Sequence, residues 1–129
     1  MQIAFTGMKL HSRNRQRIPS SCKAIFKDKE KSEAKNYCIG RLVHGIPMGL
    51  IIYAGRNQYS HMEDKKYSAI TERVFNHLTY FGTDGKYQNP QFDLGVRNKE
   101  IYADNILAIL EWSDLEPFLK DMKTMLKYK

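Results

Sequence analysis

Residues 36–55, NYCIGRLVHGIPMGLIIYAG, contain the longest apolar run of the chain and decide the fold class that the sequence predicts. Two apolar stretches flank the turn-forming string HGIPMG, in which Pro47 presets one dihedral angle and the glycines tolerate strained ones. This pattern predicts two antiparallel strands joined by a tight turn. Residues 50–53 are apolar on both faces, which is typical of an interior strand.

Two earlier segments add strands to this predicted sheet. Residues 1–7 (MQIAFTG) and 22–29 (CKAIFKDK) alternate apolar and polar side chains, which is the period of a strand with one buried face. In the second segment Lys23 and Lys27 fall on the polar face. We therefore expect these two lysines to point outward from the sheet.

Two later segments have the spacing of amphipathic helices. A helix over residues 61–81 is predicted after Ser60 and Glu63, which match a capping box. Its apolar residues recur at helical spacing: Tyr67, Ile70, Val74, Phe75, Leu78 and Phe81. A second helix over residues 114–128 has Pro117 in its first turn, where a missing amide hydrogen costs little. Its apolar residues share one face: Leu115, Phe118, Leu119, Met122, Met125 and Leu126.

Residues 99–112 fit two structures. Their apolar residues match a helix, whereas Asp104 and Asn105 also suit the turn of a hairpin between EIYA and ILAILEW. We expect the strand pair. The predicted fold is a single α+β domain over residues 1–129, with a mainly antiparallel sheet and the two amphipathic helices packed on one face.

The charge of the chain is strongly positive and unevenly placed. The formal net charge is +7, and residues 1–35 alone carry nine Lys/Arg against three Asp/Glu. A one-sided positive field favours anionic partners such as nucleic acid.

The string HSRNRQRIP, residues 11–19, places three arginines in five positions. Alternate residues of an extended segment share a side, and the planar guanidinium group fits phosphate. The interpretation that competes with this one is a solvated loop. We predict non-catalytic binding of nucleic acid through phosphate contacts, and the predicted contact residues are Arg13, Arg15, Arg17, Lys23 and Lys27.

A small metal-independent nuclease or other phosphate-ester enzyme is the second hypothesis. Residues 53–64, YAGRNQYSHMED, place Arg56, Tyr59 and His61 after a predicted strand end. A histidine that titrates near neutrality, an arginine for an anionic transition state and a tyrosine suit such chemistry. Polar residues are also ordinary in a loop between a strand and a helix. A third hypothesis is an adaptor or inhibitor that binds an acidic protein partner.

Other functional classes lack their motifs. Cys22 and Cys38 are too few for a zinc site or a disulfide scaffold, although a single disulfide stays open. The four histidines form no metal-binding motif, and the glycine spacing of GTDGK (residues 82–86) does not match a phosphate-binding loop. We therefore expect no metal and no cofactor.

No apolar run approaches the roughly 18 residues of a membrane span, and no signal peptide is recognised at the start. We expect a reduced, cytoplasmic protein with no membrane partner. A homodimer is kept as an alternative, with Met122, Met125 and Tyr128 as docking residues, although core packing explains the two methionines better.

Overall fold

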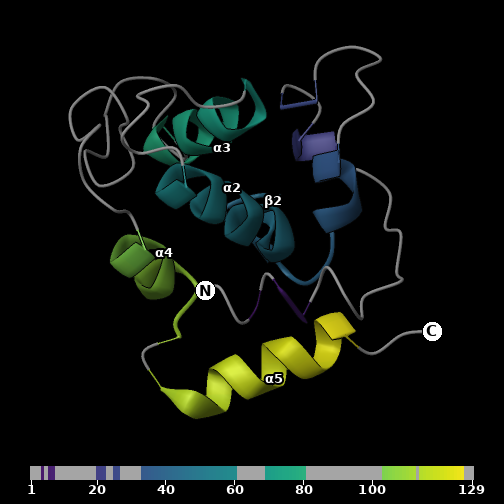
Figure 1. The fold of residues 1–129 in the computed structure, drawn as a ribbon, viewed down its shortest axis with the longest axis vertical. Helices are drawn as coiled ribbons and strands as arrows, with labels where there is room; N and C mark the ends of the chain where they lie inside the picture. Colours follow the sequence, from purple (N-terminus) through teal and green to yellow (C-terminus); the bar gives the residue numbers. More distant parts are fainter. Residues whose placement is uncertain are drawn as a thin grey trace.

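The fold is seen in a computed structural model that describes residues 4, 6–7, 20–22, 25–26, 33–60, 69–80, 103–112 and 114–126. Two 3-10 helices and a two-stranded hairpin come first: η1 (Ser20–Cys22), η2 (Glu33–Tyr37), β1 (Leu42–Val43) and β2 (Ile46–Pro47). The α-helices follow: α2 (Met48–Ser60), α3 (Ala69–Tyr80), α4 (Ala103–Ile109) and α5 (Leu115–Leu126). Figure 1 shows α2 in the middle, between α3 and α5.

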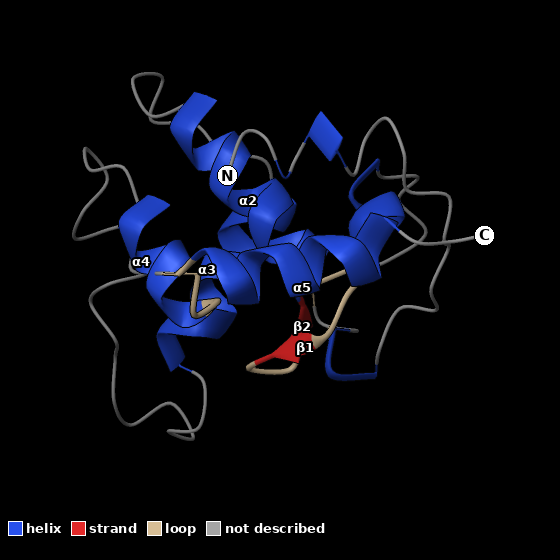
Figure 2. Ribbon diagram, turned by 90° about the horizontal axis from the view of Figure 1, so that it is seen from below, coloured by secondary structure: helices blue, strands red, loops and turns tan. Residues whose placement is uncertain are grey.

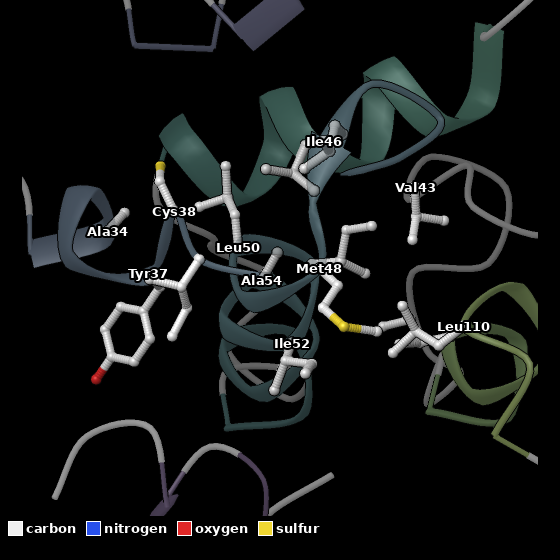
Figure 3. Packing of buried hydrophobic residues seen from close by; sticks show 14 of the residues in the cluster. Ala34, Tyr37, Cys38, Val43, Ile46, Met48, Leu50, Ile52, Ala54 and Leu110 are labelled. Atoms are coloured by element: carbon white, nitrogen blue, oxygen red, sulfur yellow. The ribbon is translucent and has the colours of Figure 1, made fainter. Parts of the chain in front are cut away.

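The central helix α2 organises the core. It packs against α3, α4, η2 and β2. Its residues Leu50, Ile51 and Ile52 are consecutive and all 0% exposed, so the first half of α2 is buried in several directions about the helix axis. Figure 3 shows Leu50 and Ile52 in the buried cluster, where Met48 extends toward Leu110, the residue after α4.

The predicted interior strand at residues 50–53 is therefore wrong, because these residues lie in α2. A helix that is buried on all sides shows no amphipathic period, and a continuous apolar run fits it as well as it fits an interior strand. Helix α2 is 13 residues long, which exceeds the usual length of a strand.

An antiparallel pair is present, but it is shorter than predicted and its second strand, Ile46–Pro47, lies within the predicted turn. Leu42 pairs with Pro47 and Val43 with Ile46, and His44 and Gly45 form the turn between them. Both turn residues have positive φ, 51° and 80°, which is the signature of a type I′ hairpin turn. Figure 2 shows the two strands in red.

The backbone before the hairpin supports the start of α2. The amide groups of Met48 and Gly49 donate to the carbonyl oxygens of Arg41 (2.9 Å) and Ile39 (3.0 Å). These bonds satisfy amide hydrogens that have no partner inside a helix. The approach is so close that a Cβ atom at Gly49 would collide with the carbonyl oxygen of Tyr37.

The strand predictions near the start of the chain are also corrected. Of residues 1–7, the structure describes Ala4, Thr6 and Gly7, which are helical and not extended, and Ala4 is buried. In residues 22–29 the carbonyl oxygen of Cys22 accepts bonds from the amide groups of Ile25 (3.0 Å) and Phe26 (3.2 Å). Such a turn is incompatible with an extended strand.

Helix α3 lies inside the predicted range 61–81, and its predicted apolar stripe is confirmed at Ile70, Val74 and Leu78. The prediction that Ser60 precedes a helix starting at residue 61 is wrong, because Ser60 is the last residue of α2. Residues 61–68, which include Glu63, lie outside the described residues.

The expected strand pair within residues 99–112 is wrong, because residues 103–109 form helix α4. This helix ends in a Schellman motif: Trp112 N–H donates to Leu107 (2.9 Å) and Glu111 N–H to Ala108 (3.1 Å). Glu111 has φ 62°, the left-handed conformation that this motif requires. Asp104 and Asn105 lie inside the helix, so their turn propensity is overridden.

Helix α5 confirms the predicted terminal helix within a few residues, with Met122 and Met125 buried. Two members of its predicted apolar face, Leu115 and Leu119, are exposed, at 69% and 53%. The two methionines face the core and not a partner, as core packing predicts, and Tyr128 lies outside the described residues.

The structure supports an α+β protein but not a mainly antiparallel sheet, because in the described ranges the sheet has two strands. Residues 50–53 and 103–109, which are predicted to form an interior strand and part of a strand pair, lie in helices α2 and α4 instead. No helix in the described part of the chain combines the length and the apolar character needed to cross a bilayer.

Candidate nucleic-acid interface

The five predicted contact residues, Arg13, Arg15, Arg17, Lys23 and Lys27, lie outside the described residues. Their convergence into one patch therefore stays a prediction. The described ranges contain nearly equal numbers of Lys/Arg and Asp/Glu, so the surplus of positive charge belongs to the other parts of the sequence.

The residues next to Lys23 and Lys27 are fixed to the folded body. Cys22 is 0% exposed and Ile25 2% exposed. The thiol of Cys22 donates to the carbonyl oxygen of Gly45 in the hairpin turn (3.4 Å). From α3, Nη1 of Arg73 donates to the carbonyl oxygen of Ile25 (3.0 Å). Cys22, just before Lys23, is thus attached to the hairpin, and Ile25, between the two lysines, is attached to α3.

Three basic side chains belong to the same corner of the fold, and we call His44, Arg73 and His77 the hairpin–α3 cluster. Arg73 and His77 are four residues apart, which places them on one face of α3. His77 Nε2 lies 2.8 Å from the carbonyl oxygen of His44. Partial burial lowers the pKa of His44, and the neighbouring His77 lowers it further.

Arg73 is partly buried, and none of the described carboxylates pairs with it. Glu72, its neighbour on α3, is exposed and forms no ion pair within the described ranges. The hydrogen bond to Ile25 uses one of the five N–H groups of the Arg73 guanidinium. The hairpin–α3 cluster was not predicted from the sequence, since its members come from two elements about thirty residues apart, as the separation of 33 between His44 and His77 shows.

The alternative catalytic residues are not brought together by the described part of the structure. Arg56 is partly buried in the second half of α2, and Tyr59 follows it in the same helix. The side chain of Tyr59 and all of His61 lie outside the described residues. The predicted setting, a loop after a strand, is wrong for Arg56 and Tyr59 because both lie in a helix.

Sequence reasoning missed a polar network around Asp121 on the buried side of α5. Arg41 donates through Nε to Oδ1 (3.1 Å) and through Nη2 to Oδ2 (3.3 Å), and Trp112 Nε1 donates to Oδ2 (2.8 Å). Arg41 Nη2 also donates to the carbonyl oxygen of Leu110 (2.7 Å). The sequence feature that could have indicated this network is an aspartate, Asp121, directly beside Met122 of the apolar stripe. Its carboxylate is occupied by these donors, so the network stabilises the fold and offers no ligand site.

Both cysteines are buried thiols and not a disulfide. Burial raises the pKa of Cys38 to about 12, and the nearby Cys22 contributes to the same direction. Cys38 is therefore protonated at neutral pH and is a poor nucleophile. Within the described ranges, no three His, Cys, Asp or Glu residues are arranged to hold a metal ion.

Comparisons with protein-family models, with curated proteins and with solved structures found no match to this chain.

Proposed function

We propose that the protein binds nucleic acid without catalysis, through contacts between phosphates and the basic first third of the chain. The proposed contact residues are Arg13, Arg15, Arg17, Lys23 and Lys27. The observation that carries the proposal is the attachment of Cys22 and Ile25 to the hairpin and α3. Because of this attachment, a phosphate held by the neighbouring lysines is held by the folded domain and not by a separate tail.

Charge supports the same proposal. The net charge of +7 would attract a polyanion over long range, and arginine forks bind phosphate oxygens in pairs. Such contacts carry little sequence information, so we propose binding to many sequences with similar affinity.

A salt titration tests the proposal. Fluorescence anisotropy of a labelled single-stranded RNA and of a DNA duplex is measured between 50 and 200 mM salt. If five phosphates are neutralised, the slope of log Kobs against log [salt] is about −3.5 for the single strand and about −4.5 for the duplex. Replacing Arg13, Arg15 and Arg17 with glutamine should reduce the magnitude of this slope by about 2 to 3. The reason is that three fewer phosphates are neutralised, so fewer counterions are released on binding.

A matched control distinguishes contacts of the first third from a general effect of net charge. Lys120 and Lys123 are exposed on α5, and their replacement with glutamine removes positive charge from another element. We expect this control variant to retain most of the affinity. Absence of binding by the unmodified protein at 50 mM salt rejects the proposed function.

The other two hypotheses are separated by different assays. A nuclease that uses His61, Arg56 and Tyr59 degrades RNA in the presence of a chelator and loses this activity in His61→Ala. An adaptor for an acidic protein retains its partner in a lysate treated with nuclease. The salt titration measures neither RNA cleavage nor binding to an acidic protein, so both assays complement it.

A further inference from the structure

We infer that the hairpin–α3 cluster is a phosphate-contact site of the folded body, with Arg73 as its principal donor and His77 and His44 beside it. This inference deepens the proposed function and rests on it. It assigns phosphate contacts to residues outside the basic first third of the chain. Sequence analysis predicts no function for these residues.

The position of Arg73 is the first argument. One guanidinium nitrogen is held by the carbonyl oxygen of Ile25, which limits the orientations of the whole planar group. A carbonyl oxygen does not neutralise the charge, and no described carboxylate does so either. A cation that is held in place and has no acidic partner among the described residues suits an external anion, because less side-chain entropy is lost on binding.

The neighbours of Arg73 are the second argument. His77 lies one turn further along the same face of α3, and its ring is positioned by the contact with the His44 carbonyl oxygen. Its Nε2–H donates to that carbonyl oxygen, so Nδ1 can donate to a phosphate oxygen only when the imidazole is protonated. Asn76, between the two on the helix, is exposed and adds an uncharged donor.

Continuity with the predicted interface is the third argument. The residue that Arg73 holds, Ile25, lies two positions from both Lys23 and Lys27. A nucleic-acid strand bound by these lysines would therefore pass close to α3. Several basic groups in a row, Lys23, Lys27 and Arg73, match the successive phosphates of one strand. They match a single carboxylate of a protein partner less well.

The test compares conservative variants in the same anisotropy assay, with the labelled single-stranded RNA as probe. Arg73→Gln keeps an N–H donor for the Ile25 carbonyl oxygen and removes the charge. His77→Gln keeps a donor near the His44 carbonyl oxygen and removes the imidazole. We expect about tenfold weaker binding for Arg73→Gln at 50 mM salt, and a salt slope reduced by about 0.7. We expect a smaller effect for His77→Gln, because glutamine replaces the donor to the His44 carbonyl oxygen and Arg73 keeps its charge.

Lys120→Gln on α5 is the matched control, since it removes one positive charge from another element. Thermal melts verify that each variant is folded. Arg73→Lys, which keeps the charge but not the planar fork, guards against a loss of binding caused by misfolding. We expect it to recover part of the affinity and most of the salt slope.

The outcomes separate the two proposals. If the unmodified protein binds RNA and Arg73→Gln binds equally well with the same salt slope, the inference is overturned while the proposed function stands. If Lys120→Gln weakens binding as much as Arg73→Gln, a specific contact at this cluster is also ruled out. If polyglutamate displaces the RNA as effectively as polyphosphate at equal charge, the site selects acidic chains in general and the phosphate assignment fails. If the unmodified protein does not bind nucleic acid, both proposals fall together.

Discussion

Asp121 shows how much a single buried carboxylate contributes to this fold. Its side chain is 11% exposed, and it binds Arg41, 80 residues away in the sequence, and Trp112, nine residues away. Replacing Arg41 with methionine leaves this carboxylate without a cation, and we expect the free energy of unfolding to fall by about 2 kcal/mol. This expected loss is smaller than the loss on breaking a fully buried ion pair, because the Arg41 side chain is 42% exposed to solvent. Urea denaturation measures the change.

A double-mutant cycle with Asp121→Asn isolates this interaction. Once the negative charge has been removed, the Arg41→Met change should cost about 1 kcal/mol less than in the unmodified protein. Additive costs would show that the two side chains act independently and that their ion pair contributes nothing measurable.

Glu111 occupies a position that glycine would fill better. It has φ 62° at the end of α4, and its side chain is exposed. Because this conformation brings Cβ close to the following carbonyl oxygen, we expect Glu111→Gly to raise the free energy of unfolding by about 0.5–1 kcal/mol. Thermal or urea melts measure the gain. Glu111→Ala, which keeps a Cβ atom, is the control and should give no such gain.

His44 makes stability depend on pH. Its pKa in the folded protein lies below the ordinary value of about 6.5, so the unfolded chain binds a proton more readily. The contribution of His44 to the free energy of unfolding is therefore lost as the pH falls through about 6.5, and it is fully retained well above that value. Stability measured from pH 7.5 to 5.5 should decrease.

The variant His44→Asn should reduce that decrease. Asparagine followed by glycine is also a preferred pair in a type I′ turn, so a gain of a few tenths of a kcal/mol is expected at pH 7.5. An unchanged pH profile in His44→Asn would assign the dependence to other groups.

At the level of elements, the junction between the hairpin and α2 is the most demanding part of the fold. In an ordinary helix Gly→Ala is stabilising by about 1 kcal/mol. At Gly49 we expect the opposite sign, a loss of about 2 kcal/mol or more, because the new Cβ would lie 2.8 Å from Cγ1 of Ile39 and would meet a backbone carbonyl oxygen. Urea denaturation of Gly49→Ala decides the sign, and a more stable variant would contradict the described packing.

The elements that could be predicted are those that expose one face. In α3 and α5, apolar residues at helical spacing alternate with charged ones, and both helices were located correctly to within several residues at their ends. Helix α2 could not be distinguished from a strand, because Leu50, Ile51 and Ile52 are all buried and β-branched residues favour strands. The short α4 was misassigned because the turn propensity of Asp104 and Asn105 was given more weight than the apolar spacing.

At the level of the whole molecule, the core should shield both thiols from solvent. Cys22 and Cys38 are 0% exposed, and burial raises the pKa of Cys38 to about 12. We expect a disulfide reagent such as DTNB to react with the folded protein about a thousandfold more slowly than with the protein in denaturant, because reaction requires opening of the core. Rapid reaction of either thiol under native conditions would contradict the described burial.

The candidate site was only partly accessible to sequence reasoning. The basic residues of the first third are evident from composition and spacing, and Lys23 and Lys27 were singled out although the strand assigned to them was wrong. The members of the hairpin–α3 cluster, in contrast, become neighbours through tertiary contacts: Arg73 reaches Ile25 across 48 residues and His77 reaches His44 across 33. No local pattern contains such pairings.

The bond between Arg41 and Asp121 has a consequence for biosynthesis. A nascent chain that has emerged only as far as α3 already contains the hairpin and α2, but Arg41 still lacks its carboxylate, and Met125 is not yet beside Gly40. The final consolidation of the core must wait for the ribosome to release residue 121. Until then the apolar surface that α5 will cover remains open to chaperones, and closing so long a loop makes this last step slow compared with local helix formation.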